Sequence, residues 1–176
     1  MENLHKDVLI MLALDLELTD LFNLCQTNKR FNTILCKNDN FWKQKYILLF
    51  GLEYYQSQKI KNHKKEYLNL LFKTNKNIDF IHNILLQIGE AITKPGLIQI
   101  GEEITSAELM GLTRKSYDYF SDKRNRIFTK PMLDKIIEYV KGKELNLRKV
   151  IYNVFRLTRL FKVFDLTEKD FYKITN

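Results

Sequence analysis

The sequence predicts an all-α protein, and three observations support this fold class. Apolar residues recur three and four positions apart along the chain, which is the spacing of one helical face. Residues that start or stop helices, such as Thr, Asn, Asp and Gly, separate these apolar runs. Only residues 97–100 offer a short β element, and they could equally be a buried connector.

Three short helices are predicted at the start of the chain. The first covers Lys6–Leu14, the second opens at Thr19 and Asp20, and the third begins near Thr27 and Asn28. Helices of under about three turns depend on packing for most of their stability, and three of them cannot bury their apolar stripes against one another alone. We therefore expect this segment to need a partner surface.

The next elements follow a polar break at residues 38–40. A helix is expected from Phe41 to Gly51, where glycine is a plausible stop, and residues 53–62 are polar and lysine-rich, which predicts a loop. A further helix is expected over 63–72.

Residues 74–77 are polar and make the predicted domain boundary. Residues 1–73 would form an N-terminal module with a trailing helix, and residues 74–176 a helical C-terminal domain. The helices expected in the second domain are 78–91, 105–110 after a capping box of Thr105 and Glu108, 113–120, 129–140, 145–161, and one starting at Thr167 and Asp170.

Composition indicates a soluble globular chain, with 45% hydrophobic and 28% charged residues among 176. No apolar run approaches the roughly 20 residues that cross a bilayer, and the first residues are too polar and acidic for a secretory signal. We expect no membrane partner and no export. Cys25 and Cys36 lie in apolar settings without a Cys-x-x-Cys pair, which predicts buried reduced thiols in a cytoplasmic or nuclear protein.

The N-terminal residues also follow the order of a known motif. Leu4 precedes the acidic Asp7 with Val8 and Leu9, and then come Asp20-Leu21, Lys29-Arg30-Phe31 and Phe41-Trp42-Lys43. This order resembles the F-box motif, which usually reads leucine-proline, acid, two or three aliphatics, aspartate-leucine, basic-basic-tryptophan and aliphatic-tryptophan. The departures are His5 in place of proline, Thr27-Asn28 in place of valine-cysteine, Phe31 in place of tryptophan, and one extra residue before Phe41.

The resemblance implies binding and not catalysis. F-box segments fold as small helical bundles that dock on the adaptor Skp1, which links them to a cullin scaffold and a ubiquitin-conjugating enzyme. The chain would then be the substrate-recognition subunit of a Skp1-cullin-F-box ubiquitin ligase, with an unknown substrate protein bound beyond about residue 77. The residues that the resemblance assigns to Skp1 binding are Leu4, Val8, Leu9, Leu12, Leu21, Leu24, Phe31, Phe41 and Trp42.

Two further points qualify this resemblance. Short, lysine- and asparagine-rich F-box proteins resemble those encoded by large DNA viruses, which would place the chain in a host cell. The same apolar residues could instead form an ordinary three-helix core.

The net charge is +8, and the basic excess lies after the F-box-like segment, in residues 59–65, 114–130 and 141–162. A basic surface favours acidic partners, nucleic acid included, and also keeps a protein in solution. The helix of region 145–162 has one apolar and one basic side, so it could follow a phosphate backbone or simply face water. The candidate contacts are Arg148, Lys149, Tyr152, Arg156 and Arg159.

Signatures of catalysis are missing from the sequence. There is no Gly-x-Gly-x-x-Gly and no Gly-Lys-Ser/Thr loop, and the histidines His5, His63 and His82 are too scattered to predict a metal site. We expect no enzyme activity, no cofactor and no metal. Three functions remain open: an F-box adaptor, a basic helical nucleic-acid-binding protein, and a helical structural protein.

Overall fold

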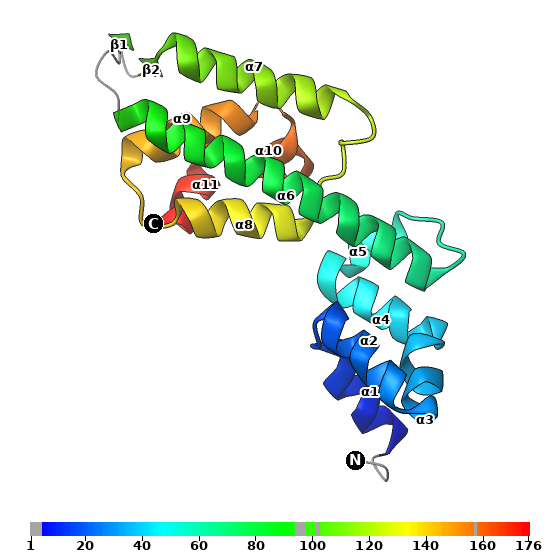
Figure 1. The fold of residues 1–176 in the computed structure, drawn as a ribbon. Helices are drawn as coiled ribbons and strands as arrows, with labels where there is room; N and C mark the ends of the chain where they lie inside the picture. Colours follow the sequence, from blue (N-terminus) through cyan, green and yellow to red (C-terminus); the bar gives the residue numbers. More distant parts are fainter. Residues whose placement is uncertain (1–4, 94–97, 101–102, 157) are drawn as a thin grey trace. The chain divides into compact units, whose positions relative to one another are not determined.

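A computed structural model describes residues 5–93, 98–100, 103–156 and 158–176, and the chain divides into two compact units, Met1–Leu71 and Phe72–Asn176. The regular secondary structure of the described residues is helical apart from one short hairpin, which confirms the all-α class (Figure 1). The N-terminal unit holds α1 (Lys6–Leu14), α2 (Leu18–Thr27), α3 (Lys29–Phe31), the π-helix η1 (Asn32–Cys36), α4 (Asp39–Phe50), α5 (Leu52–Gln56) and the first turns of α6 (His63–Thr93). The C-terminal unit holds the rest of α6, β1 (Ile98–Ile100), β2 (Glu103–Thr105), α7 (Ala107–Ser121), α8 (Lys130–Val140), α9 (Leu145–Arg156), α10 (Leu160–Val163) and α11 (Glu168–Thr175).

Asparagine caps explain where two of the early helices begin. The Asn28 side chain accepts a hydrogen bond from the backbone N–H two residues on, which starts α3. The Asn38 side chain accepts from the N–H groups two and three residues on, which starts α4. Gly51 ends α4 with φ of 90°, a conformation that costs glycine little. The start of α3 and the stop at Gly51 agree with the sequence prediction, whereas α4 begins two residues before the predicted Phe41.

Two local predictions in this unit are wrong. Thr19 and Asp20 do not cap α2, because the helix begins at Leu18 and they lie in its first turn. Residues 53–62 are not all loop, because α5 (Leu52–Gln56) occupies their first part. Five helical residues surrounded by polar chain carry too little apolar periodicity to be recognised.

Helix α6 runs without interruption through residues 74–77, where a break was predicted. Two of the four polar side chains there, Thr74 and Asn77, are buried and hydrogen-bonded, and the other two are exposed. Asn77 Nδ2 donates to the carbonyls of Asn125 at 3.0 Å and Ile127 at 2.9 Å, and Asn77 Oδ1 accepts from the Tyr119 hydroxyl at 3.0 Å. A polar residue can lie inside a helix and a core when distant parts of the chain satisfy it. The division of the chain predicted at residue 73 therefore falls inside α6.

The hairpin extends the short β element that was predicted near 97–100. Strand β1 pairs antiparallel with β2, with Ile98 opposite Thr105 and Ile100 opposite Glu103. Leu97 lies outside the described residues. Ser106 caps α7, one residue after the predicted start at Thr105, and α7 joins the two short helices predicted at 105–110 and 113–120.

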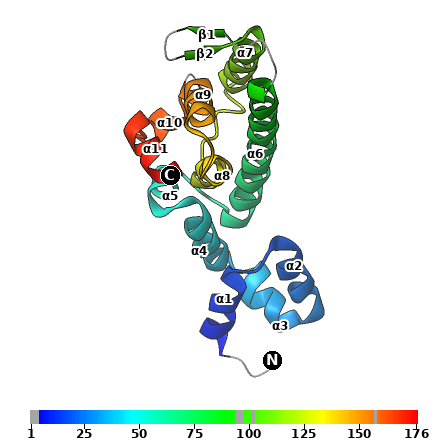
Figure 2. The ribbon, with the colours of Figure 1, turned by 90° about the vertical axis from the view of Figure 1, so that its left-hand side faces the viewer.

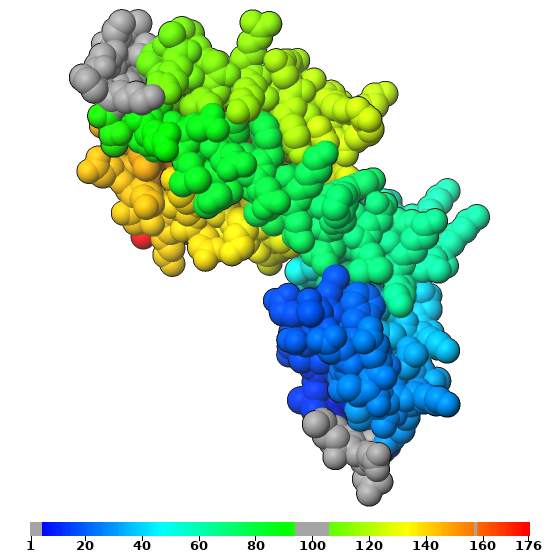
Figure 3. Space-filling view, viewed as in Figure 1, coloured from blue at the N-terminus to red at the C-terminus, as the bar shows by residue number. Residues whose placement is uncertain are grey.

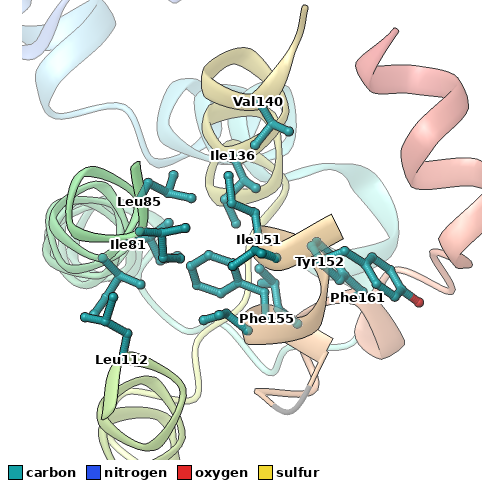
Figure 4. Close-up of a cluster of buried hydrophobic side chains, with 14 of the residues drawn as sticks. Ile81, Leu85, Leu112, Ile136, Val140, Ile151, Tyr152, Phe155 and Phe161 are labelled. Carbon is teal, nitrogen blue, oxygen red and sulfur yellow. The ribbon is translucent and has the colours of Figure 1, made fainter. Parts of the chain in front are cut away.

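Helix α9 is the centre of the C-terminal core, where it lies among α6, α7, α8 and α11 (Figures 1 and 2). Ile151 and Phe155 are fully buried and point toward α6, α7 and α8, whereas Tyr152 lies on the other side beside Phe161 (Figure 4). The Tyr152 and Phe161 rings stack with centroids 5.3 Å apart. The facing apolar side chains include Ile81 and Leu85 of α6, Leu112 of α7, and Ile136 and Val140 of α8.

Candidate partner-binding surfaces

The residues predicted to bind Skp1 differ sharply in exposure. Those buried inside the N-terminal unit are Leu9, Leu21, Phe31, Phe41 and Trp42. Val8 and Leu12 are exposed, Leu24 is half-buried, and Leu4 lies outside the described residues. The expectation that a second chain must bury these side chains is wrong for the first group. Helix α4, which contacts both α1 and η1, completes their core within the unit.

Trp42 anchors this core through its ring and its N–H group. Its ring centroid lies 6.1 Å from that of Phe22, 5.6 Å from Phe41 and 5.5 Å from Tyr67 on α6. Its Nε1 donates a hydrogen bond to the Cys36 carbonyl at 3.0 Å. Because both the ring and the indole N–H are satisfied, Trp42 holds helices together and is not available to a partner.

One face of α1 remains without cover in this unit. Val8, Met11 and Leu12 are exposed to 47%, 70% and 61%, while Leu9 and Ala13 on the other face are buried. We call these three exposed residues the α1 stripe. Their spacing of three and four positions puts them on one side of the helix, and the dark blue atoms of α1 lie at the surface in Figure 3.

Met11 was not among the predicted binding residues. Its position three residues after Val8 was the signal that could have identified it. The stripe borders a depression of about 680 Å³, open to solvent, lined by Lys6, Asp7, Ile10, Met11, Asn38, Asn40 and Gln44. Contiguous exposed apolar side chains beside a polar rim are typical of interaction sites.

Lys45 on α4 fixes the position of α1, a role that the sequence did not suggest. Its ammonium group is buried and donates to the carbonyls of Leu14 at 2.7 Å and Leu16 at 2.8 Å, just after α1 ends. Burial lowers the pKa of Lys45, and the nearby carboxylates of Asp15 and Glu17 oppose this shift. Its place three residues after Trp42, on the buried side of the helix, was the available signal.

Cys25 and Cys36 form a disulfide, so the prediction of reduced thiols is wrong. Their Cα atoms lie 6.3 Å apart because α2 packs against η1. A separation of eleven residues without a recognisable cysteine motif did not indicate this pairing. Disulfides persist mainly in oxidising environments, so the cysteines no longer support a reducing compartment.

Asp39 connects the first turns of α4 and α6. Its Oδ1 accepts the backbone N–H of His63 at 2.9 Å, and its Oδ2 lies 2.5 Å from His63 Nδ1. The Tyr55 hydroxyl lies 3.1 Å from His63 Nε2 and completes the chain of contacts. The hydrogen bond from the His63 side chain is the main cause that lowers the pKa of Asp39. These contacts fasten a helix start, since one carboxylate serves both the His63 ring and its backbone N–H.

The predicted basic stripe of region 145–162 does not form one face. Arg148 and Lys149 are half-buried, Tyr152 is buried in the core, and Arg156 and Arg159 are exposed. Arg148 Nη1 donates to the Asn176 side chain. Helix α9 ends at Arg156, before the predicted end at residue 161, and Arg159 adopts a left-handed φ of 63° ahead of α10. The amphipathic pattern was correct for the apolar side, but Tyr152 belongs to that side.

No group of three or more His, Cys, Asp or Glu side chains in the part of the chain that the structure describes is placed to hold a metal ion. None of the helices described is both long and apolar enough to cross a bilayer. No family model, curated protein or solved structure matches this chain.

Proposed function

We propose that this chain is an F-box adaptor, the substrate-recognition subunit of a Skp1-cullin-F-box ubiquitin ligase. The observation that carries the proposal is the α1 stripe of Val8, Met11 and Leu12, an uncovered apolar face within the segment that resembles the F-box motif. A Skp1-like partner would cover this stripe. The C-terminal unit would recruit the substrate protein.

The buried motif residues have a supporting part in this proposal. Phe31, Phe41 and Trp42 hold η1 and α4 together, and Lys45 ties α4 to the end of α1. They fix the helix that carries the stripe and do not touch the partner. Covering a Val, Met or Leu side chain contributes about 1.5–3 kcal/mol each, so the stripe would be the centre of a larger interface with a polar rim.

Such an adaptor works in the cytoplasm or nucleus, of a host cell if the chain is viral. Thiols are kept reduced in these compartments. The Cys25–Cys36 disulfide would then be open in the working state, and the aromatic and Lys45 contacts would hold the module. Binding to Skp1 should therefore be measured with and without a reducing thiol.

The test is binding of the purified full chain to Skp1 by isothermal titration calorimetry. Leu12→Asp should weaken binding by about 100-fold, because it puts a charge at the centre of the apolar contact. Leu52→Asp is the matched control, since Leu52 is an equally accessible leucine of the same unit, at 53% against 61% exposed, outside the stripe. Substitutions of Leu21 or Trp42 are unsuitable, because both are buried and would report folding. Equal affinity of Leu12→Asp and wild type would remove the proposal.

Two other functions, nucleic-acid binding and a purely structural role, can be told apart from Skp1 binding by further measurements. A nucleic-acid-binding protein would show affinity that falls steeply with salt and depends on Arg156 and Arg159. The structure favours this function less, because two of its predicted contact residues are not free at the surface: Tyr152 is buried in the core, and Arg148 is half-buried and bonded to Asn176. A purely structural protein would bind neither Skp1 nor nucleic acid.

A further inference from the structure

A small cavity in the C-terminal unit brings together two of the basic segments noted in the sequence. It has a volume of about 60 Å³ and is partly open to solvent. Arg126 comes from the loop between α7 and α8, and Arg159 from the turn between α9 and α10. The other lining residues that matter for binding are Tyr117, Phe120, Ser121 and Phe128.

Arg126 is held in place by hydrogen bonds that do not neutralise its charge. Its Nε donates to the Phe120 carbonyl at 3.0 Å and its Nη2 to the Ser121 carbonyl at 2.9 Å. A guanidinium has five N–H donors, so these contacts orient the group and leave donors for a ligand. Arg124 nearby is different, because its guanidinium is paired with the Asp122 carboxylate at 2.7 Å.

Arg159 is placed at the cavity by an unusual backbone conformation. Its φ of 63° and ψ of 4° are in the left-handed region, which residues other than glycine rarely adopt. Among the described residues, no carboxylate lies within ion-pair distance of Arg126 or Arg159. Two guanidinium groups that line one cavity without a counter-charge repel each other, and a bound anion would reverse that repulsion.

We propose that this cavity binds a small organic phosphate. The phosphate would lie between the Arg126 and Arg159 guanidinium groups, because planar donors pair well with phosphate oxygens. The organic part would rest against the rings of Tyr117, Phe120 and Phe128. At about 60 Å³ the cavity itself would take the phosphate group, and the organic part would lie at its open side. The proposal does not depend on Skp1 binding, since every residue it uses belongs to the C-terminal unit.

Phenyl phosphate is the probe for this site, titrated into the full chain and followed by calorimetry. We expect saturable binding that Arg126→Gln and Arg159→Gln each weaken by about tenfold or more, because each removes one charged partner. Arg114→Gln and Arg124→Gln are matched controls from the same basic segment, since both arginines are paired with aspartates. Their affinity should stay within about twofold of wild type.

A second variant separates binding from folding. Arg159→Gly removes the guanidinium and also suits the left-handed backbone, so the melting temperature should hold or rise while binding is lost. The proposal is overturned if phenyl phosphate shows no saturable binding below about 10 mM, or if both glutamine variants bind like wild type. Equal affinity for inorganic phosphate and phenyl phosphate would also overturn it, because the aromatic lining would then contribute nothing.

Discussion

The two units bury the apolar faces of their helices in different ways. The N-terminal unit is made of short helices, and specific fastenings hold it together: the Cys25–Cys36 disulfide, the buried Lys45 ammonium group and the aromatic contacts of Trp42. The C-terminal unit has longer helices around α9 and a continuous apolar core. Short helices bury little apolar area each, so polar and covalent contacts take a larger share of their stability.

The two units also differ in charge, and the C-terminal unit carries the larger excess of positive charge. Residues 1–71 carry ten Lys and Arg against eight Asp and Glu, and residues 72–176 carry nineteen against thirteen. The N-terminal unit presents an apolar stripe on α1. The C-terminal unit presents Arg126 and Arg159 at a cavity, and neither forms an ion pair with a carboxylate of the described residues. We propose a protein partner for the first and an anion for the second.

The single tryptophan makes this comparison measurable. Trp42 lies in the N-terminal unit, so its fluorescence reports that unit, whereas far-UV circular dichroism reports the helices of both. The following predictions use this difference, from the largest expected effect to the smallest.

Phe155→Ala should produce the largest loss, about 3–5 kcal/mol, because it leaves a cavity beside α9. Phe155 is fully buried in the C-terminal core. In a urea titration, the circular dichroism transition should shift to lower denaturant, while the Trp42 fluorescence transition moves less. Phe72→Ala, at a side chain exposed to 71%, is the control and should change stability by under about 0.5 kcal/mol. Equal shifts of both signals would show that the two cores unfold as one.

The double substitution Cys25→Ser and Cys36→Ser should lower the stability reported by Trp42 by about 3 kcal/mol. Closing a short loop removes conformational entropy from the unfolded chain, and this loop spans eleven positions. Adding a reducing thiol to the wild type should reproduce the shift, and the double variant should not respond to it. A wild type that is insensitive to reduction would mean that the aromatic contacts alone hold the module.

Lys45→Met should cost about 2 kcal/mol in the same fluorescence assay, because the Leu14 and Leu16 carbonyls lose their buried donor. Lys65→Met is the control, since Lys65 is exposed on α6. If Met proves neutral at position 45, water must replace the ammonium group at these carbonyls.

Asp39→Asn should have the smallest effect, below about 1 kcal/mol near neutral pH, because the Asp39 side chain is 55% exposed and solvent screens it. Its pKa is lowered in the folded state by the hydrogen bond from His63. The unfolded chain therefore binds more protons at acidic pH, so the stabilisation is present above the ordinary pKa and is lost as pH falls through the lowered one.

The measurement for Asp39 is the difference in stability between wild type and Asp39→Asn at several pH values, followed through Trp42. We expect that difference to be largest at neutral pH and to vanish in acid. A constant difference across the acidic range would show that the Asp39 carboxylate makes no net contribution.

Local signals were sufficient for many elements of the fold. Asparagine caps, the glycine stop at Gly51 and the capping box of Thr167 and Asp170 act through neighbouring residues, so they are visible in the sequence. The prediction failed where distant residues decided the outcome. A helix break was predicted at residues 74–77 because the partners of Asn77 on the 125–127 loop are about fifty positions away.

The candidate sites show the same difference between local patterns, which could be predicted, and contacts between distant residues, which could not. The apolar spacing of Val8, Leu9 and Leu12 was readable, but only packing against α4 decides which of them is buried. Tyr152 was assigned to a basic face, and its stacking on Phe161 places it in the core. The pairing of Arg126 with Arg159 at one cavity was not predictable, because thirty-three positions separate them.

The sequence by itself determined the helical class, several helix starts and stops, and the apolar periodicity of α1 and α9. Only the tertiary structure decided that Cys25 meets Cys36, that α6 continues through its polar residues, and which face of α1 stays uncovered. The physical reason is one of range. Caps and helical periodicity act over three or four residues, whereas burial, disulfide pairing and charge pairing depend on which distant segments pack together.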